Sequence, residues 1–300
     1  KIFINEQTTA QTFTLPAGCW KDMSGVVNAG GSTFTLQSLT SKIFYKVADN
    51  QCGAQSSTGT LSAKVFLGGC INWTTNLMND NLRSAGLIPS TEPYTALGYT
   101  LENTGATVTS TVLNATGNNA PVDWVVLELK NPTSGYPVAA RRACLVRRDG
   151  TVITPDGNTV ITFATTTTVG KHLVIHHRNH LGAMSGSTIA TNGQNIDFSV
   201  TTSGVFGTDA MQVNGSRRAL YCGNVNSDNV VKFTGTSNDR DPMLTAVGST
   251  TPNSNLSGYR REDVNMDGVT RYTGSGNDRD VLLIIVGSTA PTAVKTQQVP

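Results

Sequence analysis

The stretch NVNSDNVVKFTGTSNDRDPMLTAVGST (224–250) is repeated, in register and without a gap, as DVNMDGVTRYTGSGNDRDVLLIIVGST (263–289), 39 residues further along the chain. Asp228 aligns with Asp267, Phe233 with Tyr272, and the NDRD motif with itself. Repetition at a fixed period indicates one supersecondary unit that is used twice. We therefore expect the two copies to bury their apolar faces against each other.

The second copy opens with the pattern of a calcium-binding loop. Asp263, Asn265 and Asp267 alternate and are followed by Gly268. Glycine permits the sharp turn that lets the three side-chain oxygens converge on one cation. Roughly six to eight oxygens surround Ca²⁺ in proteins, so the ligand set has to be completed further along the chain.

The NDRD motif is the candidate for completing the set. Asn277 and Asp280 keep the relative spacing of the last ligands of an EF-hand loop, with VTRYTGSG (269–276) as an insertion before them. The apolar run that follows predicts a short helix capped by Gly287. In the first copy, Pro242 follows the motif, and proline is favoured as a first helical residue.

The candidate ligands are therefore spread over both copies of the repeat. Those of the second copy are Asp263, Asn265, Asp267, Val269, Asn277, Asp278 and Asp280, and those of the first are Asn224, Asn226, Asp228, Val230, Asn238, Asp239 and Asp241. Asn224 and Asn229 replace the leading aspartate and the glycine, so we expect weaker binding in the first copy. The alternative for both loops is a set of Asx-rich turns that cap helices without metal.

These motifs resemble dockerin-type calcium modules, which carry two loop-helix units and dock onto protein partners. They resemble more closely the doubled DVNxDG…YTG…NDRD tail of secreted, surface-associated proteins from bacteria that use the type IX secretion route. The resemblance covers about residues 204–300 and extends upstream to about residue 76. It implies one or two bound Ca²⁺ ions, an extracellular or cell-surface location, and docking to surface proteins or self-association.

Composition excludes several other classes of protein. Charged residues make up 14% of the chain, against about 25% in typical soluble domains. The net charge of +2 favours neither nucleic acid nor an anionic membrane as a partner. No run of apolar residues is long enough for a membrane-spanning segment.

We expect Lys1 to follow a processing site. The chain has five cysteines, and we expect a disulfide between Cys52 and Cys70.

The fold class expected from the pattern is mostly β, with one or more β-sandwich domains followed by the duplicated calcium-loop and short-helix module. VDWVVLELK (122–130) is apolar on both faces and predicts a strand buried on both sides. A hairpin turn is predicted at Asp149–Gly150. The expected domains are 1–48 (partial sandwich or strand-exchange segment), 49–76 (linker, with KVFLGG as first strand), 77–203 (sandwich) and 204–300 (calcium module).

The N-terminal segment resembles the closing strands of a small β-sandwich that commonly ends parallel β-helix proteins. Only the end of such a sandwich is present in residues 1–48, which predicts an unpaired strand edge. KIFINEQTTAQTFTLP (1–16) is the expected segment for strand exchange between chains, with Ile2 and Ile4 on one face and Phe3 on the other. The alternative is a self-contained meander.

Catalytic motifs are not found. The chain has no GxSxG, HExxH or P-loop pattern, and we expect no enzymatic activity. Its histidines all lie in one predicted strand and its exit, where a zinc site is conceivable but a structural role is favoured. These histidines are His172, His176, His177 and His180. A paired-carboxylate glycosidase site among Glu92, Glu102 and Glu128 stays open, although none lies in a recognisable motif.

Three classes of function remain from the sequence: a structural protein, an interaction module, and an enzyme in its own right. The favoured one is a non-enzymatic extracellular structural or adhesive protein, with assembly into a filament by β-strand complementation as one form. The alternative is a carbohydrate- or protein-docking module from the C-terminal end of a secreted enzyme. Trp20, Trp73 and Trp124 lie in three separate segments, which disfavours a flat aromatic platform for sugar rings.

Overall fold

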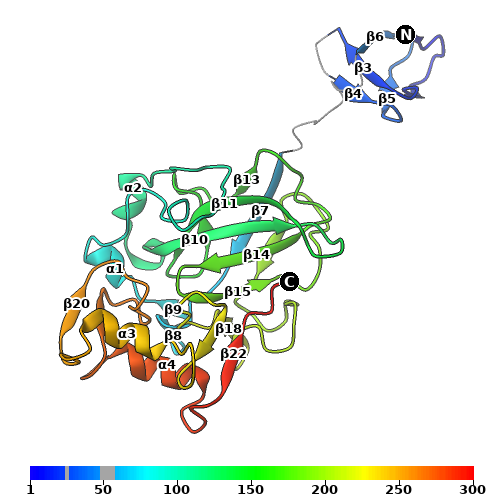
Figure 1. Cartoon of the computed structure of the whole chain (residues 1–300). Coiled ribbons are helices and arrows are strands. Elements are labelled where there is room, and N and C mark those ends of the chain that lie inside the picture. Colours follow the sequence, from blue (N-terminus) through cyan, green and yellow to red (C-terminus); the bar gives the residue numbers. More distant parts are fainter. Residues whose placement is uncertain (24–26, 48–57) are drawn as a thin grey trace. The chain divides into compact units, whose positions relative to one another are not determined.

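The computed structural model describes residues 1–23, 27–47 and 58–300 and divides into two compact units, Lys1–Ser57 and Thr58–Pro300 (Figure 1). We call them the N-terminal unit and the C-terminal unit and describe each by itself. Both are built mainly from β-strands, which confirms the expected mostly-β class. None of the helices among these residues is long and apolar enough to cross a membrane.

The strands of the N-terminal unit form an antiparallel sheet in the order β1-β6-β3-β4 and a separate β2–β5 pair. The core is largely aromatic, because Trp20 and Phe44 are buried together with Leu15, and Phe3 and Phe34 pack against them. The strands are β1 (Ile2–Ile4), β2 (Gln11–Thr14), β3 (Cys19–Asp22), β4 (Val27–Ala29), β5 (Thr33–Leu36) and β6 (Ser41–Val47).

The strand predicted for exchange has a partner within its own unit. β1 pairs antiparallel with β6, and Ile2 lies opposite Ile43. Phe3 packs in the aromatic core, whereas Ile2 and Ile4 are 64% and 57% exposed. Ile43 and Tyr45 are also exposed, so one face of this sheet presents apolar side chains outward.

The disulfide expected between Cys52 and Cys70 is wrong. Cys70 is a buried free thiol, whereas Cys19 in β3 is disulfide-bonded. Cys52 and most of the predicted linker lie outside the described residues. Spacing along the chain favoured the wrong pair because the fold takes Cys70 into the core of the C-terminal unit.

The C-terminal unit contains a five-stranded antiparallel sheet in the order β12-β11-β10-β14-β15 and a three-stranded sheet in the order β13-β7-β16. β10, β11 and β14 run side by side, and β7 passes near them (Figure 1). The five-stranded sheet contains β10 (Pro121–Lys130), β11 (Val138–Arg147), β12 (Val152–Ile153), β14 (His172–His177) and β15 (His180–Met184). The three-stranded sheet contains β7 (Gly59–Lys64), β13 (Ile161–Phe163) and β16 (Asn195–Asp197).

Two local predictions for this unit are confirmed. Every residue of β10 is buried, as expected for a strand with two apolar faces. β11 and β12 pair antiparallel across the Asp149–Gly150 turn, where Gly150 has a φ of +88°. Asp149 Oδ1 accepts a hydrogen bond of 2.9 Å from the N–H of Thr151 and fixes that turn.

The first strand of the C-terminal unit lies earlier than predicted. β7 consists of GTLSAK, which composition assigned to the linker, whereas the predicted strand KVFLGG lies almost wholly after it. Leu61 and Ala63 are buried, and alternate residues of β7 face away from the core. Small polar residues concealed this two-residue period in the sequence.

Short elements complete the β part of this unit and connect it to the tail. They are β8 (Ile71–Asn72), β9 (Leu77–Met78), α1 (Asn81–Ser84), α2 (Ser110–Leu113), the 3-10 helix η2 (Gly117–Asn119), β17 (Gln212–Asn214) and β18 (Arg217–Ala219). Helix α1 lies within the segment NLMNDNLRSAGLIP (76–89).

The duplicated tail forms two short helices that pack together (Figure 1). Each begins within the NDRD motif and ends at a glycine, Gly248 or Gly287, as predicted. Their shared core includes Met243 and Leu282, together with Leu181 from β15. The tail elements are β19 (Val230–Lys232), α3 (Arg240–Val247), β20 (Asn255–Ser257), β21 (Val269–Arg271), α4 (Asp278–Val286) and β22 (Val294–Thr296). β22 pairs with β19, and β20 pairs with β21.

The first testable prediction concerns this shared core. Leu282 is fully buried in α4, whereas Ile284 of the same helix is 62% exposed. Leu282→Ala should lower the free energy of unfolding by roughly 2–5 kcal/mol, because it deletes buried methyl groups and leaves a cavity. The matched control Ile284→Ala should change it by less than about 0.5 kcal/mol. Urea unfolding measures both, and equal effects of the two substitutions would contradict the proposed packing.

Candidate functional site

The two copies of the tail repeat have the same backbone geometry. Left-handed φ angles occur at matching positions, +65° at Ser227 and Asn229 and +58° and +88° at Met266 and Gly268. Asparagine adopts this conformation more readily than most residues. Asn229 therefore preserves in the first loop the turn that Gly268 makes in the second.

Alternating side chains brace both loops through hydrogen bonds to the backbone. In the second loop, Asn265 accepts a bond of 2.9 Å from the N–H of Asp267, and Asp267 accepts one of 2.9 Å from the N–H of Val269. The equivalent bonds to Asn226 and Asp228 in the first loop are 3.0 Å and 2.9 Å long. These oxygens keep further lone pairs that could bind a cation.

The first position of the loop differs between the copies. Asp263 is fully buried and accepts hydrogen bonds from the N–H groups of Asp267 (3.1 Å) and Gly268 (2.9 Å). Asn224 is also buried, but its Oδ1 has no hydrogen-bond partner among the described residues. An orphaned buried oxygen at the leading ligand position fits a loop that takes a cation.

The middle aspartate of NDRD closes each loop onto its helix. Asp278 is fully buried and accepts hydrogen bonds from the N–H groups of Val264 (2.7 Å), Asn265 (3.2 Å) and Arg271 (2.8 Å). Asp239 makes the same set of bonds in the first copy. The sequence pattern ranked this residue no higher than its neighbours, yet it is the carboxylate that reaches both sides of the loop.

The other NDRD residues cap the helices. Asn277 accepts a 2.8 Å hydrogen bond from the N–H of Asp280, and Asn238 accepts one of 2.9 Å from that of Asp241. The side chains of Asp280 and Asp241 are 54% and 61% exposed and pair with the adjacent arginines. The structure therefore does not bring these two carboxylates together with the leading ligands.

Buried carboxylates dominate the electrostatics of the tail. Burial is the main cause that raises the pKa of Asp263 to about 6 and that of Asp278 to about 7. The charge of Asp267 contributes to the raised pKa of Asp263, and the charge of Asp263 contributes to that of Asp278. Burial likewise raises the pKa of Asp239 to about 6. A bound cation would offset the cost of holding these groups ionised.

The donor set fits calcium only if amide and backbone oxygens bind the ion together with the carboxylates. Within residues 1–23, 27–47 and 58–300, no three or more His, Cys, Asp or Glu side chains form a metal-binding group. Each loop instead combines carboxylates with amide and backbone oxygens, the hard donors that Ca²⁺ accepts. Arg271 forms an ion pair with Asp267, and this arginine would have to swing away for Asp267 to bind a cation.

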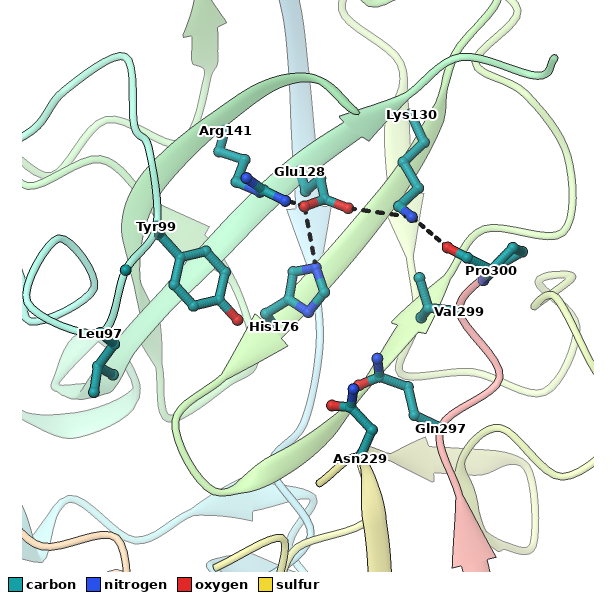
Figure 2. A pocket seen from close by; sticks show the side chains of 11 residues that line it. Leu97, Tyr99, Glu128, Lys130, Arg141, His176, Asn229, Gln297, Val299 and Pro300 are labelled. Atoms are coloured by element: carbon teal, nitrogen blue, oxygen red, sulfur yellow. Dashed lines mark hydrogen bonds and ion pairs between the residues drawn. The ribbon is translucent and has the colours of Figure 1, made fainter. Parts of the chain in front are cut away.

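A polar groove is the second candidate site in the C-terminal unit. Figure 2 shows its first pocket, with a volume of about 360 Å³, in which Glu128 of β10 lies between cationic side chains. Glu128 forms ion pairs with Arg141, His176 (3.5 Å) and Lys130 (3.7 Å). Although burial opposes ionisation, His176 and Arg141 lower the pKa of Glu128 to about 2. Lys130 also donates a hydrogen bond to the carbonyl of Pro300.

Asp123 lies at the centre of a buried network beside this groove. Its carboxylate accepts hydrogen bonds from His177 Nε2 (3.0 Å), Arg178 Nε (3.0 Å) and the hydroxyl of Tyr259 (2.7 Å). Burial opposes ionisation of Asp123, but Arg178 and His177 outweigh it and lower the pKa of Asp123. Arg178 donates a further hydrogen bond to the carbonyl of Arg260 in the tail.

The histidines have more partners than the sequence indicated. Spacing along the chain indicates no acidic partner for them, but the fold places Asp123 against His177 and Glu128 against His176. His180 Nδ1 lies 2.8 Å from His177 Nδ1. The signal in the sequence was the pair of acidic residues inside a strand with two apolar faces, because buried charges require partners.

The three glutamates considered for a glycosidase pair have separate roles. Glu92 accepts hydrogen bonds from the N–H groups of Tyr94, Thr95 and Gly105 and so fixes a turn. Glu102 accepts bonds from the N–H groups of residues 164 and 165. Glu128 is engaged by the cations of the groove, so each carboxylate serves a different part of the fold.

Comparisons with protein-family models, curated proteins and solved structures find no match to this chain.

The raised pKa values predict how the stability of the tail changes with pH. An aspartate whose pKa is raised on folding binds its proton more tightly in the folded state. The free energy of unfolding therefore decreases as the pH rises through the pKa of the folded state. With chelator present, the free energy of unfolding should therefore fall between pH 6.5 and pH 8, by on the order of 1 kcal/mol, a range above that in which the lowered pKa values of His177 and His180 act in the opposite direction. Asp278→Asn should flatten this slope, and urea unfolding at each pH measures it. Stability that rises with pH over this range would contradict the assignment.

Proposed function

We propose that this chain is a non-enzymatic extracellular protein with a structural or adhesive role, stabilised by one or two Ca²⁺ ions in its duplicated tail. The observation that carries this proposal is the repeated loop geometry, in which Asp263 and Asp278 are fully buried and form no ion pair with a basic side chain among the described residues. An extracellular setting is supported by the disulfide-bonded Cys19, since disulfides persist in oxidising compartments.

In the second loop, Asp263, Asn265, Asp267 and the carbonyl of Val269 would hold the ion, with Asp278 as the closing carboxylate. Asp278 replaces Asp280 in this role because Asp280 faces solvent. The first loop would use Asn224, Asn226, Asp228, Val230 and Asp239 in the same way. With asparagine in place of the leading aspartate it carries one carboxylate fewer, so it should bind Ca²⁺ more weakly.

Calcium would stabilise the tail because each loop is joined to the shared helical core. Val225 and Val264, which follow the leading ligands, are both buried in that core. A bound cation would offset the free-energy cost of burying the charged loop carboxylates, which lie where the loop, the helix and the core meet. The tail would then act as a rigid, calcium-dependent clamp at one end of the β part of the chain.

The second testable prediction is a calcium-dependent melting temperature. A ligand that binds only the folded state, at a hundredfold excess over Kd, stabilises it by about 2.7 kcal/mol. Asp263→Asn should remove most of the stabilisation, whereas the matched substitution Asp280→Asn should retain it, because Asp280 lies outside the loop. Calorimetric melting with calcium and with chelator measures both variants. Identical curves with and without calcium for the unmodified chain would disprove calcium binding.

The structural or adhesive part of the proposal is supported by the N-terminal unit. Ile2, Ile4, Ile43 and Tyr45 form an outward apolar face on its sheet. Because β1 is already paired with β6, association through this face is a simpler route to an assembly than exchange of β1, which would first have to leave its partner.

The third testable prediction concerns this apolar face. Ile43→Lys should weaken self-association, because it places a charge at the centre of the face, and should leave the melting temperature nearly unchanged. Lys46→Ala in the same strand is the matched control. Sedimentation and electron microscopy of the complete chain in calcium measure assembly. A wild-type chain that stays monomeric at high concentration would contradict self-association.

The alternative function, a carbohydrate- or protein-docking module of a secreted enzyme, is favoured by a different observation. The polar groove beside β14 collects charged and hydrogen-bonding side chains. Such a groove suits a small polar ligand, and both functions can coexist in an adhesive protein.

A further inference from the structure

The groove consists of two neighbouring pockets beside the β14–β15 hairpin. The first is the pocket of Figure 2, and the second has a volume of about 400 Å³. Tyr99, His176, Asn229 and Gln297 are among the residues that line both pockets, so the two adjoin. Their volumes fall within the range of small-molecule sites.

His180 and Arg178 line the second pocket and are buried, and each has a hydrogen-bonding atom that the protein leaves unused, as does Asn224 of the first calcium-type loop. His180 Nε2 and Arg178 Nη2 have no hydrogen-bond partner among the described residues. His180 is 2% exposed and Arg178 is 7% exposed, and both line the pocket. Buried polar atoms in native proteins are nearly always paired, so these two atoms point to a partner outside the chain.

The hydrogen-bond chain behind His180 determines which role its Nε2 can play. A carboxylate only accepts hydrogen bonds, so His177 must donate to Asp123 from Nε2, and its Nδ1 then carries a lone pair. His180 Nδ1 lies 2.8 Å from that lone pair and must carry the proton. Neutral His180 therefore presents an acceptor at Nε2, while Arg178 Nη2, which belongs to the same pocket lining, is a donor.

Hydroxyl groups of one ligand can satisfy both atoms, because a hydroxyl can donate to His180 and can accept from Arg178. Water offers the same chemistry, so a hydroxyl alone does not identify the ligand. The charges of the pocket supply the second criterion.

The second pocket is cationic. No aspartate or glutamate lines it, and Asp123 behind it is already engaged by Arg178. Arg261 lines the pocket and has no ion pair or side-chain hydrogen bond within the described part of the chain. In the neighbouring pocket, Glu128 pairs with Arg141 and Lys130, and Lys130 also donates a hydrogen bond to the backbone oxygen of Pro300. The second pocket is therefore the part of the groove that favours an anion.

We infer that the groove binds a hydroxylated carboxylate of the uronic-acid type. Hydroxyls of one sugar pair with His180 Nε2 and Arg178 Nη2, and the carboxylate of the same sugar pairs with the free guanidinium of Arg261. Tyr99, at the boundary of the two pockets, supplies an apolar surface for the ring. This inference names a ligand for the proposed adhesive function and rests on that function for its extracellular setting, but it does not depend on calcium ligation.

The fourth testable prediction is selective binding of an acidic monosaccharide to the complete chain. Calorimetric titration with D-glucuronate should show saturable binding, whereas D-glucose, which lacks the carboxylate, and acetate, which lacks the hydroxyls, should each bind at least about tenfold more weakly. Acetate that binds as tightly as glucuronate would indicate an adventitious ion only. That result, or the absence of saturable glucuronate binding, would overturn the inference.

Substitutions inside and outside the groove test where glucuronate binds. Arg261→Gln should weaken glucuronate binding about tenfold or more, because it removes the cationic partner of the carboxylate. Arg217→Gln is the charge-matched control, since Arg217 lines neither pocket, and it should bind as the wild type does. His180→Phe should weaken binding as well, and its melting temperature reports whether it folds. If Arg261→Gln retains wild-type affinity, the inference is wrong.

The calcium and glucuronate experiments test separate proposals, so one proposal can be disproved without the other. A chain that binds glucuronate but shows no calcium-dependent melting would disprove only the calcium module. A chain with calcium-dependent melting and no glucuronate affinity would disprove only the groove ligand.

Discussion

The C-terminal unit depends on the charge buried at Asp123. Its carboxylate receives donors from two separate parts of the chain: His177 and Arg178, where β14 enters the β14–β15 turn, and Tyr259 between the two tail repeats. A buried charge that loses its partner is strongly destabilising, so these segments are held together by the cost of separating them. Apolar packing alone would not select one orientation of the tail on the sheet.

Asn179, at the tip of the β14–β15 hairpin, connects the hairpin to both calcium-type loops through hydrogen bonds. The backbone carbonyl of Asn179 accepts hydrogen bonds from Gly223 (2.9 Å) and Asn224 (3.1 Å), at the start of the first loop. Its side-chain amide donates to the carbonyls of Arg261 (3.0 Å) and Asp263 (2.9 Å), at the start of the second. One asparagine therefore sets the position of both repeats, and the same tip carries Arg178 and His180 into the groove. The tip of the β14–β15 hairpin therefore positions both the proposed calcium-binding loops and the proposed ligand site.

The parts of this arrangement that follow local rules could be predicted from sequence. A strand with two apolar faces, a hairpin at Asp149–Gly150 and helices that begin at NDRD each depend on residues close together in the chain. The parts that failed depend on distant contacts. Tyr259 lies 136 positions from Asp123, and neither periodicity nor spacing reveals such a pair. The closing role of Asp278 was missed because EF-hand spacing favoured Asp280, and only the fold shows which carboxylate faces the loop.

The most direct measurement of this account is amide hydrogen exchange in Asp123→Asn, with Asp156→Asn, a turn aspartate outside the network, as control. The substitution leaves Arg178 buried without its counter-charge, which costs roughly 3–5 kcal/mol. The account predicts faster exchange in α3, α4 and the β14–β15 hairpin of Asp123→Asn, and wild-type rates in the control. Wild-type protection of α3 and α4 in Asp123→Asn would contradict the claim that this buried charge holds the tail on the sheet.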